Sequence, residues 1–350
     1  MSVIVGIVII AVISIICSIG GYKAILQVEQ YFWIPFFLIF LIIYGQVGKY
    51  ADINAPATAT GPSLSGSILT LLAIMYGAAS AWCSIISDYY VHYPTDTSKV
   101  RIFLLTTFGL WIPMALGLVV GFLMGSTTLT NQQWADQYDD NGISGLLLYI
   151  LHPSGFAKFL VAILSLSGGA YSDVPHSILA DNLFQIVGLN AMAIYSAALS
   201  IQQFAKPLQA VPRFIWSLLV FAAIIALAVG GRTQILNFLS NFLSLLGYYN
   251  TVFVAILSIE HYYFRKGDLA NYDLEGWNTP SRLPIGFAGL TAFSCGIAGA
   301  ILGMVETYYV GCIAKMIGTG GGDIGNELAL VFTVMTYFPL RALELKCVGR

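Results

Sequence analysis

The chain has 350 residues, of which 58% are hydrophobic and only 9% charged, with a net charge of −2 and a mean hydropathy of +0.81. Soluble domains carry about 25% charged residues, so this composition excludes a water-soluble globular protein, whose surface would be covered by large apolar patches. The near-neutral charge gives no attraction to nucleic acid, and the five cysteines form no C-x-x-C pair that would indicate a disulfide framework or a zinc site.

Continuous apolar runs predict about nine membrane-spanning helices, because each crossing needs about 20 mostly apolar residues. Backbone groups in lipid need internal partners, and the runs are too continuous for the alternating strands of a β-barrel. We therefore predict an all-α polytopic membrane protein. The predicted spans are 3–20, 31–48, 67–91, 102–125, an interrupted span 156–203, 214–230, 234–263, 284–310 and 327–345.

The basic residues of the loops predict the orientation of the chain. Of the 15 Lys and Arg residues, eleven fall on the side that holds the C-terminus and four on the other side. The positive-inside rule therefore places the C-terminus in the cytoplasm. Met1 would then start outside, at the edge of an apolar run, so we expect an N-terminal part to precede this chain.

The span 67–91 contains the features most typical of a ligand site. The residues from Gly77 to Ala81 are all small, which permits close helix packing and local unwinding. Trp82 follows near mid-membrane, where it either stacks on a flat aromatic ligand or packs between helices. Asp88 lies six residues later, and such an acid is either a proton-coupling group or an interfacial residue held by hydrogen bonds.

Asparagines mark two further spans. The amide of Asn190 offers donors and an acceptor, which match either the edge of a nucleobase or an interhelical hydrogen bond. We interpret the three asparagines of the span 234–263 first as interhelical residues. They are Asn237, Asn241 and Asn250.

Polar residues elsewhere do not indicate catalysis. Glu260 and His261 lie beside Arg265 and Lys266, an arrangement that predicts a solvated interfacial cluster. The sequence contains no H-E-x-x-H motif, serine elbow or Walker loop, and the glycine-rich stretch 318–322 predicts a flexible turn. We therefore expect no catalytic residue, no metal and no enzyme, since an enzyme within the membrane needs acids, histidines or thiols clustered at one depth.

Several segments together resemble fungal purine-cytosine permeases of the nucleobase:cation symporter-1 family. Trp82, with the Ser-Asp-Tyr sequence at 87–89, is similar to that family's sixth span. The C-terminal third carries the most specific segments, which are 260–267 (EHYYFRKG), 277–278 (WN), 282–286 (RLPIG), 309–311 (YVG), 322–325 (GDIG) with Glu327, and 339–346 (PLRALELK).

The resemblance implies a single transmembrane transporter domain over 1–350, with a LeuT-like fold of two inverted five-helix repeats plus two extra helices. The chain would hold the end of the first repeat (1–50), the second repeat (67–264) and the extra helices (284–345), and would lack the first three helices. Substrate would bind at mid-membrane between discontinuous helices, with alternating access by rocking of the repeats.

The resemblance also implies roles for individual residues. Trp82 matches the tryptophan that stacks on the nucleobase ring. Asn190 is the one amide kept from a motif like Asn-Asn-Ile-Pro-Asn, since 189–193 reads Leu-Asn-Ala-Met-Ala here, and these departures leave the substrate's identity open. Asp88 and Ser84 are candidate coupling or gating residues.

Residues 168–185 depart from the family pattern. Asp173, Pro175 and His176 lie in mid-span, where they are unfavourable in a lipid-exposed helix. Our hypothesis is that this stretch is a non-native insertion, an intron read through in gene prediction. Sequencing the transcript tests it, because a mature message that retains these codons rejects the hypothesis.

The function implied by the resemblance is a proton symporter that imports purines and cytosine across the plasma membrane. Its substrate would be a nucleobase of the cytosine, adenine, guanine and hypoxanthine class. Its surroundings would be the lipid bilayer, and it would need no cofactor beyond the coupling proton and no nucleic-acid partner. The alternatives are a truncated, non-transporting remnant, or a related carrier of allantoin, uracil or a vitamin such as thiamine or pyridoxine.

Overall fold

The structure is a computed structural model that describes most of the chain. The described residues are 8, 11, 12, 14–16, 18–20, 34, 37–52, 54, 55, 59–94, 96–151, 184–231, 235–273, 276, 279 and 281–348. Over these residues the regular structure is helical, and extended backbone pairs only in one isolated bridge, between Val305 and Val310.

The long helices have the length and composition of membrane spans. Among the described residues, five helical stretches are long and apolar enough to cross a membrane, and two shorter helices, Phe37–Val47 and Phe287–Gly303, are apolar as well. The prediction of an all-α polytopic membrane protein is confirmed. The five stretches are Pro62–Ser84, Lys99–Thr130, Arg213–Gly230, Ser240–Phe264 and Gly325–Val348.

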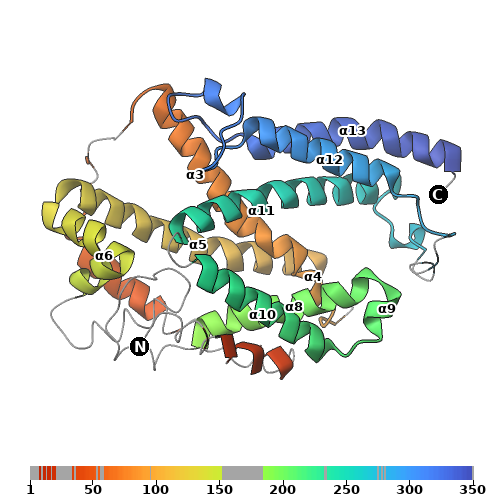
Figure 1. The fold of residues 1–350 in the computed structure, drawn as a ribbon, viewed down its shortest axis with the longest axis horizontal. Helices are drawn as coiled ribbons and strands as arrows, with labels where there is room; N and C mark the ends of the chain where they lie inside the picture. The colour runs from red at the N-terminus through yellow and green to blue at the C-terminus, as the bar shows by residue number, and fades with distance from the viewer. Residues whose placement is uncertain are drawn as a thin grey trace. The chain divides into compact units, whose positions relative to one another are not determined.

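Figure 1 shows the helices, coloured along the chain from red at the N-terminus to blue at the C-terminus. The longer elements are α3 (Pro62–Ser80), α5 (Lys99–Thr130), α6 (Gln132–Ile150), α8 (Phe184–Phe204), α10 (Arg213–Gly231), α11 (Ile235–Ser258), α12 (Phe287–Gly303) and α13 (Gly325–Val348). The short elements are η1 (Ala81–Ser84), α4 (Ser87–Tyr90), α9 (Lys206–Gln209), η4 (Ile259–Phe264), η5 (Leu269–Asn271) and η6 (Ala314–Met316).

The chain divides into two compact units. The first unit comprises Met1–Pro56 and Asp88–Ile235, and the second unit comprises Ala57–Ser87 and Leu236–Arg350. The second unit therefore joins α3 and η1 to the last three long helices. The predicted division of a single domain into repeats at 1–50, 67–264 and 284–345 stays a prediction.

In the first unit, helix Phe37–Val47 packs with α5 and α6 around an apolar core that includes Val47, Val120 and Trp134. The Tyr44 hydroxyl donates to the Leu116 carbonyl of α5 at 2.6 Å. Further along, the α8–α10 hairpin is held by the Arg213 guanidinium, which lies 4.6 Å from the centre of the Tyr195 ring.

In the second unit, α11, α12 and α13 lie side by side (Figure 1). Small residues of α12 let its backbone approach α13 closely, because a Cβ atom at Gly299 would lie 2.8 Å from the Leu328 carbonyl oxygen. Tyr248 and Val252 of α11 complete the core with Ala300 and Ala329.

Two elements differ from the sequence prediction. Helix α6 lies between the predicted spans 102–125 and 156–203, where no helix was predicted, because its acidic residues lower the hydropathy of any 20-residue window. Its apolar residues nevertheless gather on one face, with Trp134 and Leu146 in the core of the first unit. Helix α12 ends at Gly303 and not at 310, because the chain turns extended at Met304 and forms the Val305–Val310 bridge. The part of the interrupted span before α8 lies outside the described residues, and with it residues 168–183 of the insertion proposed for 168–185, whose last two residues begin α8.

Candidate substrate site

The α-helical part of the span ends where the run of small residues ends. α3 ends at Ser80, and the chain continues as the 3-10 turn η1 (Ala81–Ser84) before the short helix α4. The Trp82 carbonyl accepts from both Ile85 and Ile86, at 3.2 and 3.0 Å, which closes this turn. The span therefore changes from α-helix to a tighter 3-10 turn at Ala81, the last of the small residues.

Trp82 and Ser84 lie together in this turn. The Trp82 side chain is half-buried, and its indole ring stacks on no other aromatic ring of the described residues. The Ser84 hydroxyl donates to the Ala81 carbonyl at 3.1 Å, so it stabilises the turn. Asp88 follows in the first turn of α4 and is partly buried.

Asn190 lies in the helical part of α8, as predicted, but its side chain falls outside the described residues. It belongs to the first unit, whereas Trp82 belongs to the second. The joint role of Trp82 and Asn190 in holding one base therefore stays a prediction.

The break in α3 directly follows a close crossing with α11. A Cβ atom at Gly77 would lie 1.9 Å from the Leu243 carbonyl oxygen, and a Cβ atom at Gly247 would lie 3.3 Å from the Gly77 Cα atom. The two backbones therefore touch here, as the small residues of the sequence predicted for α3.

A buried hydroxyl ties three helices together at this crossing. The Thr251 hydroxyl of α11 lies 2.9 Å from the Gly247 carbonyl, 3.0 Å from Asn326 Oδ1 of α13 and 3.1 Å from the Tyr76 hydroxyl of α3. These contacts hold the end of α3 in place before the chain unwinds.

Asn250 adds an unpaired polar atom beside the broken end. Its side chain is 1% exposed, and its nitrogen lies 3.5 Å from the Ser80 hydroxyl, the last residue of α3. Its oxygen has no hydrogen-bond partner among the described residues. The sequence predicted an interhelical hydrogen bond for Asn250. The one feature of the sequence that points to this residue is an amide within an apolar span.

Comparisons with known proteins decide the family. The family described as "Permease for cytosine/purines, uracil, thiamine, allantoin" matches residues 1–319 of the chain. The chain belongs to this permease family. Family membership agrees with the expectation that the protein is not an enzyme.

The chain is similar to curated fungal proteins over nearly its whole length. It is 34% identical to purine-cytosine permease FCY21 of Saccharomyces cerevisiae, over 99% of this chain and 62% of that protein. It is also 34% identical to purine-cytosine permease fcyB of Emericella nidulans, over 99% of this chain and 64% of that protein. Vitamin B6 transporter TPN1 of S. cerevisiae is 29% identical, over 99% of this chain and 65% of that protein.

The permease chain spans less than two-thirds of the length of these relatives. No solved structure matches it.

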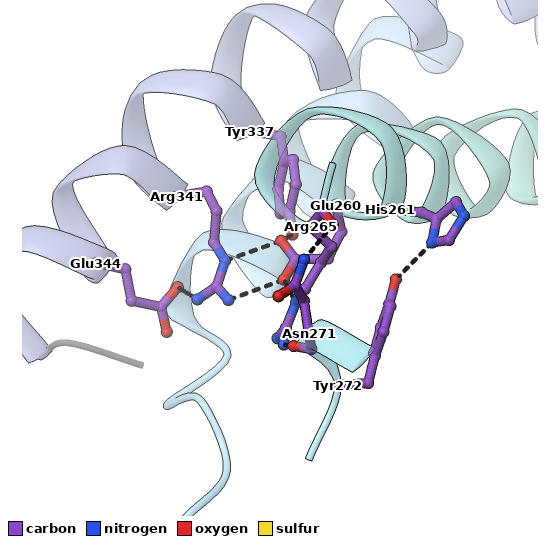
Figure 2. Close-up of polar contacts among 8 residues, drawn as sticks. All are labelled: Glu260, His261, Arg265, Asn271, Tyr272, Tyr337, Arg341 and Glu344. Atoms are coloured by element: carbon purple, nitrogen blue, oxygen red, sulfur yellow. Dashed lines mark hydrogen bonds and ion pairs between the residues drawn. The ribbon is translucent and has the colours of Figure 1, made fainter. Parts of the chain in front are cut away.

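At the opposite end of α11, the chain carries a network of ion pairs (Figure 2). The Glu260 carboxylate accepts from Arg341 of α13 at 2.9 and 3.0 Å, and from Arg265 and the Tyr337 hydroxyl at 3.0 Å each. Arg341 also lies 3.5 Å from Glu344. The prediction of a solvated cluster is wrong for Glu260, whose side chain is 16% exposed and pairs with Arg341, which is 4% exposed, whereas Lys266 is exposed.

Proposed function

We propose that the chain belongs to a secondary active transporter that imports purines and cytosine across the plasma membrane by proton symport. The observation that carries the proposal is the similarity of 99% of the chain to two proteins named purine-cytosine permeases. The change from α-helix to a 3-10 turn after Ser80 supports it, because transporters bind substrate where spanning helices are interrupted.

The site would recognise a base by its flat face and by its edge. The half-buried Trp82 ring offers a stacking surface, and stacking of a base on an aromatic side chain contributes about 1–3 kcal/mol. The unpaired Asn250 oxygen would accept from the exocyclic amino group of adenine or cytosine, while Asn190 would contact another part of the edge.

The coupling ion in this proposal is the proton, and Asp88 and Ser84 are the candidate coupling or gating residues within the broken span. The distribution of the Lys and Arg residues supports a cytoplasmic C-terminus. In this orientation substrate and proton would enter from the side of the α12–α13 connection.

Uptake of radiolabelled cytosine and adenine in a permease-null cell tests the proposal. We expect uptake by the full-length, correctly spliced protein, and a rise in KM of about 5- to 150-fold for Trp82→Ala, which corresponds to the stacking free energy. The matched control is Trp111→Ala, because Trp111 of α5 is 63% exposed in a predicted lipid-facing position. A full-length, correctly spliced protein that reaches the membrane and takes up neither base rejects the proposal.

A vitamin carrier is the second candidate, because vitamin B6 transporter TPN1 is similar over the same 99% of the chain. Competition distinguishes the two. Unlabelled pyridoxine, thiamine, allantoin or uracil would displace the labelled base only if the site accepts that compound. Failure of the chain to accumulate in membranes would instead support the non-transporting remnant.

A further inference from the structure

The connection between α12 and α13 buries two acidic side chains in the second unit. Glu306 is 5% exposed and Asp323 is 1% exposed. The connection is held closed by backbone hydrogen bonds, including Gly311 to Met304 at 2.8 Å and Ile324 to Gly303 at 2.9 Å. Both acids are therefore almost wholly buried, and Glu306 keeps the larger contact with water.

Asp323 is surrounded by hydrogen-bond donors. The Tyr248 hydroxyl of α11 donates to Oδ2, the Gly325 N–H at the start of α13 donates to Oδ1 at 2.9 Å, and the Val305 N–H lies 3.4 Å from Oδ2. Donors to a carboxylate favour its ionised form, and the N-terminus of a helix favours negative charge. Asp323 is therefore the member of the pair that carries the charge.

Glu306 has the opposite surroundings. Its Oε1 atom is buried without a hydrogen-bond partner among the described residues. Burial and the charge of Asp323 raise the pKa of Glu306 from 4.5 to about 8. Burial raises the pKa of Asp323 as well, but its three donors oppose that shift and Glu306 has no comparable donors. Glu306 is therefore the member that holds a proton.

The elements around the pair supply no compensating positive charge. Within the described part of the chain, neither acid forms an ion pair with a basic residue. The titratable groups that face the pair are Tyr248 from α11, Tyr308 from the connection and Glu327 from α13. α3 contributes the Thr70 hydroxyl, which accepts from the Asp323 N–H at 3.4 Å, and Lys315 of the connection is exposed.

We propose that Glu306 and Asp323 form a proton-binding site, in which Glu306 takes up and releases one proton while Asp323 stays ionised. On uptake, a hydronium ion gives its proton to the Glu306 carboxylate, so that one O–H bond of hydronium breaks, the carboxyl O–H bond forms, and a water molecule is left. On release, a second negative charge faces Asp323 without a partner, so repulsion and hydration open the connection. We assign this proton as the one whose movement is coupled to transport of the base, an assignment that rests on the proposed function.

We assign a proton as the ligand, since the described residues contain no group of three His, Cys, Asp or Glu side chains that could hold a metal ion. The Tyr248 hydroxyl also directs its hydrogen toward Asp323, where it would repel a cation. Sodium remains an outcome that the experiment can detect.

Thermal unfolding of the purified chain in detergent, between about pH 5 and about pH 9, tests proton binding. A raised pKa in the folded state gives stability that is complete below the ordinary pKa and is lost as the pH rises through the folded pKa. We expect the Tm of the wild type to fall over this interval. The Tm of Glu306→Gln, which mimics the protonated side chain, should fall less. The Tm of Asp139→Asn, a change at an exposed acid of α6, should fall as much as that of the wild type.

Asp323→Asn provides a second variant, because removal of its charge should move the fall in Tm to lower pH. The proposal is overturned if the Tm values of the wild type and of Glu306→Gln fall by the same amount over this pH interval. It is also overturned if sodium, at constant pH, raises the Tm of the wild type and not that of Glu306→Gln.

Uptake measurements test the coupling. We expect Glu306→Gln to lose the accumulation of cytosine driven by external acid, and to lose the alkalinisation of the medium that accompanies uptake. Accumulation by this variant with the wild-type dependence on pH overturns the coupling role. If the wild type takes up no base at any pH, the proposed function fails, and the unfolding experiment still decides whether the pair binds a proton.

Discussion

At the scale of single residues, the Asn250 side chain uses its two polar atoms differently. The nitrogen lies 3.5 Å from the Ser80 hydroxyl, whereas the buried oxygen has no partner among the described residues. An unpaired buried acceptor costs about 1–3 kcal/mol. A donor that reaches this oxygen would remove that cost, and the amino groups of adenine and cytosine are donors of this kind.

Replacement of Asn250 should therefore discriminate between bases. We expect Asn250→Ala to weaken competition by adenine about 5- to 100-fold, and to weaken competition by hypoxanthine less, since hypoxanthine has no exocyclic amino group. The measurement is inhibition of labelled cytosine uptake by each base. Asn241→Ala is the control, because both polar atoms of Asn241 already bond to Thr307. An equal effect on both bases would contradict a role for the Asn250 oxygen.

The ion pair between Glu260 and Arg341 should dominate the stability of the α11–α13 contact. Arg341→Met leaves two carboxylates near one another in a partly buried site, so we expect a loss of about 3–5 kcal/mol in the free energy of unfolding. The control is Arg282→Ala, which breaks an ion pair with Asp273 whose side chains are 51% and 43% exposed. That change should cost less than about 1 kcal/mol. Similar losses in Tm for both variants would contradict the larger contribution of the buried ion pair.

The sequence indicates residue types more readily than their partners. The amide of Asn250 and the acid of Glu260 stand out in the sequence as polar residues of an apolar span, which indicates that each has a specific role. Their surroundings depend on residues far along the chain, since Glu260 meets Arg341 across 81 positions. No local pattern reveals such a contact, and for this reason Glu260 was predicted to be solvated.

At the scale of elements, Gly77 decides how closely α3 and α11 approach. A Cβ atom there would meet the Leu243 carbonyl oxygen at 1.9 Å, so the helices must separate if any side chain is added. We expect Gly77→Ala to destabilise the protein by about 1–3 kcal/mol and to reduce uptake. Gly121→Ala in α5, where nothing lies within 4 Å of the added atom, should leave both Tm and uptake near the wild type. Equal behaviour of the two alanine variants would show that the crossing tolerates expansion.

Sequence periodicity and composition anticipate some elements better than others. The run of small residues from Gly77 predicted the close packing of α3, since close packing depends on local side-chain size, and the local unwinding also predicted there takes the form of a 3-10 turn after Ser80. The identity of the partner helix, α11, depends on tertiary contacts and was not predicted. The sequence does not predict α6, because its acidic residues lower the mean hydropathy although one face is apolar. It predicts an α12 that extends too far, because apolar residues continue into the extended segment after Met304.

At the scale of the whole molecule, the apolar composition and the five long apolar stretches of the described residues make lipid the natural surroundings of the chain. The orientation in that lipid rests on the basic residues alone. α13 places the α12–α13 connection at one end and the C-terminus at the other. The 24-residue length of α13, at 1.5 Å per residue, is enough to cross the hydrocarbon core.

Two natural cysteines test the orientation at these two ends. Cys312 lies exposed in the α12–α13 connection, and Cys347 lies exposed in the last turn of α13. With the C-terminus in the cytoplasm, a variant that keeps only Cys312 should react with a membrane-impermeant maleimide in intact cells. A variant that keeps only Cys347 should react only after permeabilisation. The reverse pattern would place the C-terminus outside, and the connection that carries Glu306 and Asp323 would then exchange protons with the cytoplasm, so the proposed proton would bind from the inner side.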